Sequence, residues 1–434
     1  MPFRLFILLV AISSSCFGQT FKVGFAKQNI TPTRPTPMWG YGARHDKLST
    51  GVLDALHAKA CVIQAGTKTL AIVGLDLGRS PRDDMMTRIR AAIKAEAGID
   101  FVLMSGSHTH HGPVLELLDE KGKGKDKFDD AIAYTAELEQ KLIHTIVAAA
   151  GELQDAQIGW AAKQLPMNRN RHSKITPKPV DQELGVIRFD DVNGKPLVII
   201  ANFAAHPTMI AAADLRFSAD WPGQMASTVE ATMNVPCIFM QGASGDMSTR
   251  TDEDTRGHIA YGKAVGEHVV ELAKKIATTR PDKPSIQAKD QTFEFEARLP
   301  LNNPLVRSMF SLAFFPELTN AVVVDEVAQG KIKPHLTTVL INEQLALVGG
   351  SGEFFCNHAI RLKERSRADE TFFFGYCNGH NMYFPTIEAA AEGGYGADPT
   401  VSWVSLGAGE EMMNNALINI YTMLGAYKFK LGGL

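Results

Sequence analysis

Three of the chain's 13 histidines fall within four residues, in the segment 107–113. Imidazole binds borderline metals such as Zn²⁺ and moves protons near neutral pH, so this concentration indicates chemistry rather than packing. In extended backbone, positions i and i+2 point to one side, so His108 and His110 should face a common point while His111 faces away. Such a pair can supply two metal ligands, or one ligand and one supporting group. The alternative is a solvated polar loop.

Two further candidate ligands follow apolar stretches of the chain. His206 comes shortly after the apolar residues 197–203 and directly precedes Pro207, a junction that can hold a side chain rigidly. Glu353 follows a Gly-Gly-Ser-Gly stretch, which lets backbone pass close to a ligand or metal. Taken alone, His206 could be an ordinary loop histidine and Glu353 a surface glutamate.

Residues 242–248 read Gly-Ala-Ser-Gly-Asp-Met-Ser and follow another apolar run. Small residues, an acid and two hydroxyls in this position could form a turn that presents a nucleophile. The Gly-x-Ser-x-Gly elbow of serine hydrolases is not matched.

A strand, a helix and a second strand must position the histidine segment. Residues 69–75 and 101–104 are short apolar runs suited to buried strands. Between them we expect a helix with Ser80 as its N-cap, Pro81 in its first turn and Gly98 at its end. A unit of this length implies a parallel pair joined by a right-handed crossover. Its carboxyl edge, where α/β proteins place their sites, would then carry the histidines.

Similar apolar runs recur downstream and end in polar residues. Residues 197–203 and 237–240 predict two more strands, 336–340 with 345–348 a hairpin, and 372–374 another strand. We therefore expect an α/β fold with mixed β-sheets flanked by helices, in a single large catalytic domain.

Size and charge exclude several classes of protein. A chain of 434 residues with 45% hydrophobic and 21% charged residues can bury a large core, which excludes disordered and disulfide-stapled proteins. The 44 basic residues nearly cancel the 47 acidic ones, and a net charge of −3 gives no field that would steer nucleic acid. We expect no nucleic-acid partner.

The N-terminus has the pattern of an export signal. Arg4 precedes an apolar run at 5–12 and small residues up to Gly18, so we expect residues 1–18 to be a signal peptide and residues 19–434 the catalytic domain. The protein would then be periplasmic or secreted; lipidation at Cys16 is the less favoured alternative. The other four cysteines are too scattered for a disulfide scaffold, although one bridge is compatible with their number.

Several motifs, taken together and in chain order, resemble the N-terminal catalytic domain of the neutral/alkaline (non-lysosomal) ceramidase family. They extend from about residue 20 to the C-terminus. They are Met38-Trp39-Gly40-Tyr41, Ala58-Lys59-Ala60, the histidine segment 107–113, Asn168-Arg169, segments 202–207 and 245–248, Gly352-Glu353-Phe354 and the stretch 378–395.

The resemblance implies one zinc ion per chain in an amidase that cleaves the fatty-acyl amide of ceramide. By motif position it assigns the zinc ligands His108, His206, Glu353 and Tyr383. It also assigns His110 as a second active-site histidine, Ser248 as the catalytic serine, and Arg169 and Tyr395 as substrate or transition-state contacts. The tyrosine ligand stays open among Tyr376, Tyr383 and Tyr395.

This assignment agrees with the chemistry of amide hydrolysis. An amide is a poor electrophile, so its hydrolysis needs stabilisation of the carbonyl oxygen and an activated nucleophile. His110 could pass a proton to the leaving amine, while Arg169 or Tyr395 donates to the oxyanion. Direct attack by Ser248 and attack by water both remain open, with water slightly favoured. The alternatives are a metal-dependent esterase or amidase on a non-lipid substrate, and a non-catalytic lipid-binding relative.

Two departures from the family bear on the substrate. Family members continue into a C-terminal β-sandwich, which we expect this chain to lack. Thr249 and Arg250 follow the serine where ceramidases carry Pro and Asn, and Arg250 suggests a substrate with an anionic group. The apolar segment 305–315 could line an acyl channel or make peripheral contact with a membrane, although core packing is the favoured interpretation. The oligomeric state is not predicted.

Overall fold

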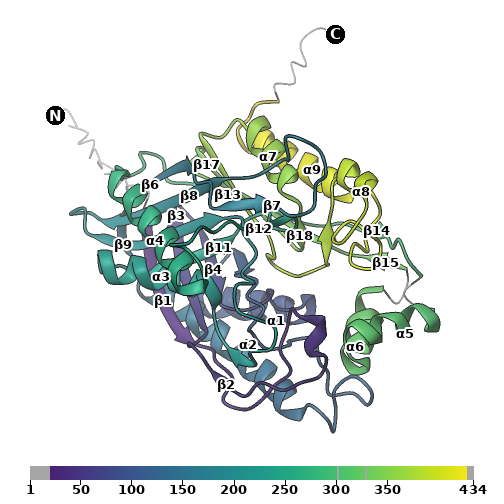
Figure 1. The fold of residues 1–434 in the computed structure, drawn as a ribbon. Coiled ribbons are helices and arrows are strands. Elements are labelled where there is room, and N and C mark those ends of the chain that lie inside the picture. The colour runs from purple at the N-terminus through teal and green to yellow at the C-terminus, as the bar shows by residue number, and fades with distance from the viewer. Residues whose placement is uncertain (1–19, 301–302, 328–329, 428–434) are drawn as a thin grey trace, which may run out of the picture.

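The first half of the chain forms an eight-stranded sheet (Figure 1). The computed structural model describes residues 20–300, 303–327 and 330–427. The strand order is β11-β9-β8-β6-β1-β3-β4-β5. The bounds are β1 (Phe21–Asn29), β3 (His57–Ala65), β4 (Lys68–Leu75), β5 (Phe101–Gly106), β6 (Gln154–Gln164), β8 (Glu183–Asp191), β9 (Pro196–Phe203) and β11 (Cys237–Gln241). The predicted signal peptide 1–18, with Cys16, lies outside the described residues, so export stays a prediction.

The predicted strand–helix–strand unit is confirmed. β4 and β5 pair in parallel, and α1 (Asp83–Ala97) connects them. Gly98 ends the helix in the left-handed conformation, at φ 67°. The predicted cap is wrong, because α1 begins at Asp83 with Arg82 at the N-cap position. The Ser80 hydroxyl instead accepts a hydrogen bond from the backbone N–H of Gly379, joining this loop to the C-terminal half.

A second, four-stranded sheet is built by the C-terminal half in the order β13-β16-β17-β19. The predicted hairpin is present, since β16 and β17 pair antiparallel, and β19 then pairs in parallel with β17. The bounds are β13 (Ile286–Thr292), β16 (His335–Ile341), β17 (Leu345–Gly350) and β19 (Glu370–Phe374).

The two sheets pack face to face between outer layers of helices, because most of their strands are apolar on both faces. Ile72 of β4 and Leu347 of β17 belong to one apolar cluster between the sheets, whereas Val73, the neighbour of Ile72, packs in the cluster formed with the helices. Helices α1, α2 (Asp129–Gly151), α3 (Asp220–Met233) and α4 (His258–Lys275) cover the large sheet, and α7 (Cys356–Arg365) and α9 (Ala408–Met423) cover the small one. Mixed sheets with flanking helices in a single domain are therefore confirmed.

Short elements complete the fold around the sheet edges. Helices α5 (Pro304–Ala313) and α6 (Pro316–Val327) form a pair that stands beside the main body (Figure 1). The remaining elements are a 3₁₀ turn (Gly42–Arg44), β2 (Gly51–Val52), β7 (Asn168–Asn170), β10 (Arg216–Phe217), β12 (Met247–Thr249), β14 (Phe295–Glu296), β15 (Lys331–Ile332), β18 (Glu353–Phe354), β20 (Tyr383–Phe384) and α8 (Ile387–Glu392). Within the described ranges no helix is long and apolar enough to cross a membrane. The four described cysteines are free and buried.

Candidate active site

The histidine segment leaves β5 at the carboxyl edge of the large sheet, as predicted. Nε2 of His110 lies 3.3 Å from Nε2 of His108, while His111 faces away and contacts the guanidinium of Arg44. The backbone is not extended as expected, because His108 adopts a left-handed conformation with φ 67°. A side chain other than glycine rarely adopts this conformation, and such strain is concentrated at functional sites.

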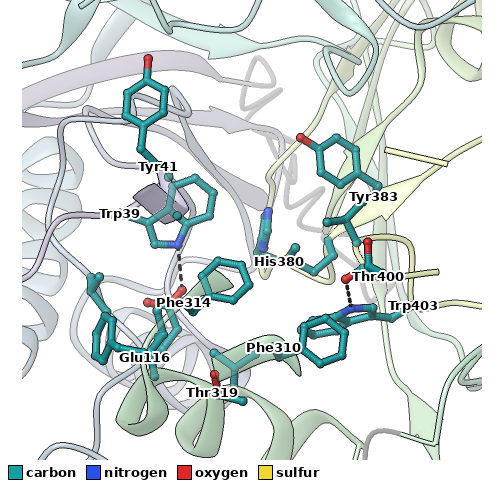
Figure 2. Close-up of a pocket in the computed structure, with 18 of the residues that line it drawn as sticks. Trp39, Tyr41, Glu116, Phe310, Phe314, Thr319, His380, Tyr383, Thr400 and Trp403 are labelled. Carbon is teal, nitrogen blue, oxygen red and sulfur yellow. Dashed lines mark hydrogen bonds between the residues drawn. The ribbon is translucent and has the colours of Figure 1, made fainter. Parts of the chain in front are cut away.

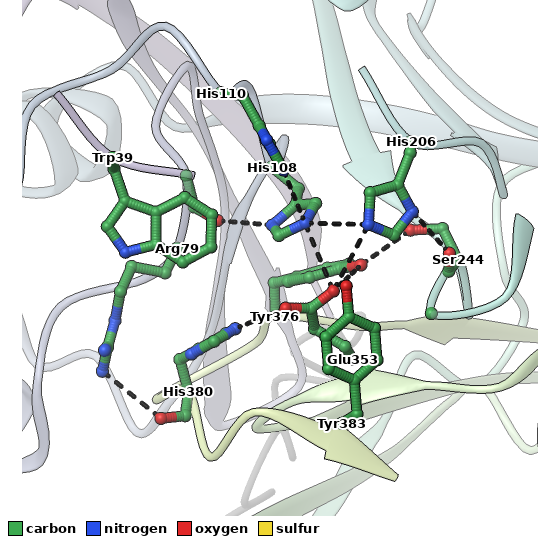
Figure 3. A network of polar contacts seen from close by, with 12 residues as sticks. Trp39, Arg79, His108, His110, His206, Ser244, Glu353, Tyr376, His380 and Tyr383 are labelled. Atoms are coloured by element: carbon green, nitrogen blue, oxygen red, sulfur yellow. Dashed lines mark hydrogen bonds and ion pairs between the residues drawn. The ribbon is translucent and has the colours of Figure 1, made fainter. Parts of the chain in front are cut away.

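His206 and Glu353 join the two histidines from separate segments of the chain (Figure 3). His206 follows β9, and Glu353 begins β18, just after the glycine-rich turn that ends β17. Nε2 of His206 lies 3.1 Å from Nε2 of His108, and Oε2 of Glu353 lies 3.3 Å from each of these nitrogens. All three side chains are buried. We call His108, His110, His206 and Glu353 the central cluster.

Backbone carbonyls orient both imidazoles toward the centre. A carbonyl only accepts, so Nδ1 of His108 donates to Gly78 O at 2.9 Å and Nδ1 of His206 donates to Ser244 O at 2.7 Å. In the neutral tautomers the Nε2 lone pairs therefore point inward.

The central cluster suits a metal ion. Nε2 of His108 faces two other imidazole nitrogens and a carboxylate oxygen, and a cation bound among these atoms would stabilise them. The three histidines could hold a metal, since their ligand atoms lie within 4.8 Å of one another. Imidazole nitrogens with one carboxylate are a donor set that Zn²⁺ prefers.

The surroundings keep the carboxylate of Glu353 charged and the imidazoles of His110 and His206 neutral. Burial would raise the pKa of Glu353, but His108, His206 and His380 hold it well below its usual range. Burial, followed by the charge of Arg171, lowers the pKa of His206 to about 3. Burial also lowers the pKa of His110 well below its ordinary value. Neutral imidazoles beside a carboxylate are the protonation states that metal binding requires.

All three candidate tyrosines lie near the central cluster, in different roles. The buried Tyr376 hydroxyl bonds the Ser244 hydroxyl at 2.8 Å and donates to Glu353 at 3.4 Å, and its ring stacks on His108. The buried Tyr383 hydroxyl accepts from Arg171 at 3.2 Å. Tyr395 is 66% exposed and contacts the Tyr383 ring edge-on.

The arginine beside the central cluster is Arg171 and not the predicted Arg169. β7 ends at Asn170, whose side-chain oxygen accepts from the backbone N–H groups of His172 and Ser173 and so turns the chain. Nη2 of Arg171 thereby lies 3.0 Å from Nε2 of His206 and donates to Gly245 O. Arg169 points outward from the strand and is exposed. Burial would lower the pKa of Arg171, but Tyr383 and Glu353 favour its charge and the pKa is raised.

Ser248 lies next to His206 through a backbone bridge between β12 and the segment after β9. Within the described part of the chain its hydroxyl makes no hydrogen bond, whereas Ser244, four residues earlier, is bonded to Tyr376. Arg250 is exposed and is not among the described residues that line the cavity, so the predicted anionic group has no support from its position.

Two features of the site were not predicted. Nε2 of His380 lies 3.4 Å from the second carboxylate oxygen of Glu353. Beyond it, Arg79 and Glu116 form a buried ion pair at 2.9 Å, to which Nε1 of Trp39 also donates. A histidine in the polar, glycine-containing segment 378–381 is a sequence signal from which the His380 contact could have been predicted. No local sequence pattern indicates the Arg79–Glu116 ion pair.

A cavity of about 620 Å³ opens beside the central cluster, with His110 and Glu353 in its wall. Tyr383 lies in the same wall (Figure 2). The rest of the wall is mainly apolar and comes from the segment after β1, from α5 and α6, and from the loop before α9. These residues include Met38, Trp39, Tyr41, Val306, Phe310, Phe314, Leu318, Val401 and Trp403. The size fits a small lipid or drug-sized ligand. Core packing, the favoured interpretation of segment 305–315, holds for Phe310 and Phe315, which are buried in apolar clusters. The segment also lines the cavity, and some of its other side chains are exposed.

Comparison with known proteins assigns the family. Residues 21–260 match the family model described as neutral/alkaline non-lysosomal ceramidase, N-terminal. The chain belongs to this family. Among its relatives, it is 27% identical to neutral ceramidase B of Dictyostelium discoideum over 170 residues, which are 35% of this chain and 24% of that protein. It is 24% identical to neutral ceramidase 2 of Arabidopsis thaliana over 248 residues, 52% of this chain and 32% of that protein. The matches span a third or less of these relatives.

Solved ceramidase structures have the same fold. The neutral ceramidase from Pseudomonas aeruginosa superposes with a TM-score of 0.75 at 16% identity, covering 96% of this chain and 76% of that one. A ceramidase complexed with C2 gives 0.73 at 17% identity, with 96% of this chain and 77% of that chain covered. The fold of this ceramidase-family chain is therefore established well beyond the segment that the family model matches.

Proposed function

We propose that the protein is a zinc-dependent amidohydrolase that cleaves the N-acyl amide of ceramide or a related N-acyl lipid to a fatty acid and an amine. The observation that carries this proposal is a metal-type cluster of His108, His206 and Glu353 at the wall of an apolar cavity. Hydrolysis of a lipid amide needs polar catalytic groups and an apolar binding site together. The neutral ceramidases among the relatives support the same bond and substrate class.

We assign one Zn²⁺ per chain to His108, His206, Glu353 and Tyr383. When bound, zinc acts as a Lewis acid on the amide carbonyl and lowers the pKa of water. Tyr383 is preferred over Tyr376 because the Tyr376 hydroxyl is already bonded to both Ser244 and Glu353. The Tyr383 hydroxyl has Arg171 as its partner and lies at the cavity wall.

The side chains of the site divide the remaining work. His110 is half-buried, and desolvation lowers the pKa of its imidazole, which is therefore neutral and can take a proton from the nucleophile and return it to the leaving amine. Arg171 keeps its charge and can donate to the carbonyl oxygen as negative charge develops there. Tyr395, at the exposed side of the cavity, would contact the substrate. We favour water over Ser248 as the nucleophile, because no described base contacts the Ser248 hydroxyl.

The test is fatty-acid release from a panel of N-acyl lipids and simple acyl esters, with and without a chelator. We expect N-acyl lipids to be hydrolysed, the chelator to abolish release, and added Zn²⁺ to restore it. Cleavage of esters with no cleavage of amides would contradict the amidase proposal. Binding of N-acyl lipid without any release would indicate a non-catalytic relative.

A further inference from the structure

Helix α5 exposes large apolar side chains along one face. Leu312 is 84% exposed and Leu305 77%, the highest values for large apolar residues in the described part of the chain. Met309 is 64% exposed. These three residues stand at positions i, i+4 and i+7, so they lie on one face of the helix, which we call the outer face of α5.

The adjacent face of the same helix lines the cavity. Val306 and Phe310 form part of the cavity wall, and Phe310 is 7% exposed and packs edge-on against Trp403 (Figure 2). Met309 belongs both to this wall and to the outer face. Met309 therefore connects the exposed apolar residues of α5 with those that line the cavity.

The outer face of α5 has too little charge to favour a charged binding partner. Arg307 is the one charged residue of α5, and its Nη2 donates to Oδ1 of Asn320 on α6 at 2.8 Å. Asn303 caps the helix by accepting from the backbone N–H of Leu305, so the helix is formed without a covering partner. Apolar side chains on such a helix, next to a cavity for a lipid, are suited to the boundary between head groups and acyl chains.

We propose that the outer face of α5 docks on a lipid bilayer and delivers the N-acyl lipid past Met309 into the cavity. The inference rests on the proposed function for the nature of the substrate, because a lipid with a long acyl chain resides in a bilayer and not in water. Docking of the outer face of α5, next to the cavity wall, would keep the acyl chain in apolar surroundings during transfer.

The test is co-flotation of the full chain with phosphatidylcholine vesicles that contain no substrate. We expect the Leu305→Ser/Leu312→Ser double variant to lose about tenfold or more in vesicle affinity, because two apolar side chains no longer enter the lipid. Neither residue lines the cavity. The matched control is Ile259→Ser/Ile418→Ser, which removes exposed side chains from α4 and α9 and should bind as the parent protein does.

A second readout separates docking from catalysis. The Leu305→Ser/Leu312→Ser variant should hydrolyse a short-chain, water-dispersed N-acyl substrate at the parent rate and a vesicle-embedded long-chain substrate at least several-fold more slowly. Equal vesicle binding by parent and variant would overturn the inference. Vesicle binding that occurs only with anionic lipids and disappears in salt would also overturn the inference, because it would be electrostatic. So would a change from dimer to monomer in the variant, because the outer face of α5 would then be a contact between copies of the chain. Absence of hydrolysis by the parent, with vesicle binding intact, would instead count against the proposed function alone.

Discussion

At the scale of single residues, the site combines groups from distant segments around His108. Its strained backbone and the carbonyl of Gly78 fix the direction of its ring, and Glu353 and His206 meet it within 3.3 Å. Burial makes each of these contacts sensitive to small displacements, because water cannot substitute for a lost partner. A substitution that moves or removes one of these side chains should therefore lower activity strongly, even where it changes only a few atoms.

Arg171 and Arg169 form a natural pair for testing the assignment of the site arginine. Arg171→Ala should lower kcat by about 10²-fold or more, because a donor to the developing oxyanion is lost. Arg169→Ala should leave kcat within about twofold of the parent, since an exposed side chain away from the reacting atoms supplies no transition-state contact. Steady-state rates of fatty-acid release measure both. The reverse order of the two effects would return the role to Arg169.

Gly40 tests how closely His110 must be placed. A Cβ at Gly40 would lie 2.4 Å from the His110 ring, at a φ of 99°. Gly40→Ala should therefore displace His110 and lower kcat by an order of magnitude or more. Gly98→Ala is the matched control, because its φ is also positive, at 67°, but nothing lies within 4 Å of the added atom. It should cost about 1 kcal/mol of stability and leave kcat unchanged. Similar kcat values in both variants would show that His110 tolerates displacement.

At the scale of elements, the loops after β4 and β5 hold the edge of the large sheet where the site lies. The Arg79–Glu116 pair joins these two loops, and Trp39 from the segment after β1 donates to the same carboxylate. Trp39 in turn contacts the rings of His108, His110 and His380 edge-on. The pair thus supports the wall against which the histidines pack.

The Arg79–Glu116 pair has a predictable pH dependence. Burial would raise the pKa of Glu116, but Arg79, the Leu115 N–H and Trp39 hold it below its usual value. Its stabilisation is therefore present above the unfolded pKa, near 4.5, and is lost as the pH falls through the folded value. Glu116→Gln should cost about 3 kcal/mol at pH 7, because the buried guanidinium loses its carboxylate.

The free energy of unfolding of parent and variant, measured against pH, tests this account. The difference between Glu116→Gln and the parent should be constant above about pH 6 and shrink below about pH 4.5. Glu137→Gln on the exposed face of α2 is the control and should show almost no difference, since its ion pair with Lys141 is at the surface. A Glu116→Gln difference that grew on acidification would contradict the assigned direction of the pKa.

At the scale of the whole molecule, the sequence predicts the features that depend on residues close together in the chain, and it does not predict those that depend on contacts between distant segments. The parallel β4–β5 pair comes from one short segment, so the apolar pattern was sufficient to predict it. His108 and His110 do face each other, but through the left-handed backbone of His108 and not through the extended backbone on which the prediction rested. Arg171 was not separable from Arg169, because Asn-Arg-Asn-Arg contains two candidates and the choice depends on where β7 ends. The His380 contact and the Arg79–Glu116 pair depend on packing between the two halves of the fold, for which local pattern carries no information.

We expect one zinc ion at His108, His206, Glu353 and Tyr383, and metal analysis of the purified protein is the decisive test of the proposed zinc-dependent hydrolysis. The parent protein should contain about one zinc per chain. His108→Ala should lose both metal and turnover, whereas His111→Ala, at a histidine that faces away, should keep the metal. A parent protein with below about 0.2 zinc per chain after gentle purification, yet fully active on N-acyl lipids, would show that hydrolysis does not depend on zinc.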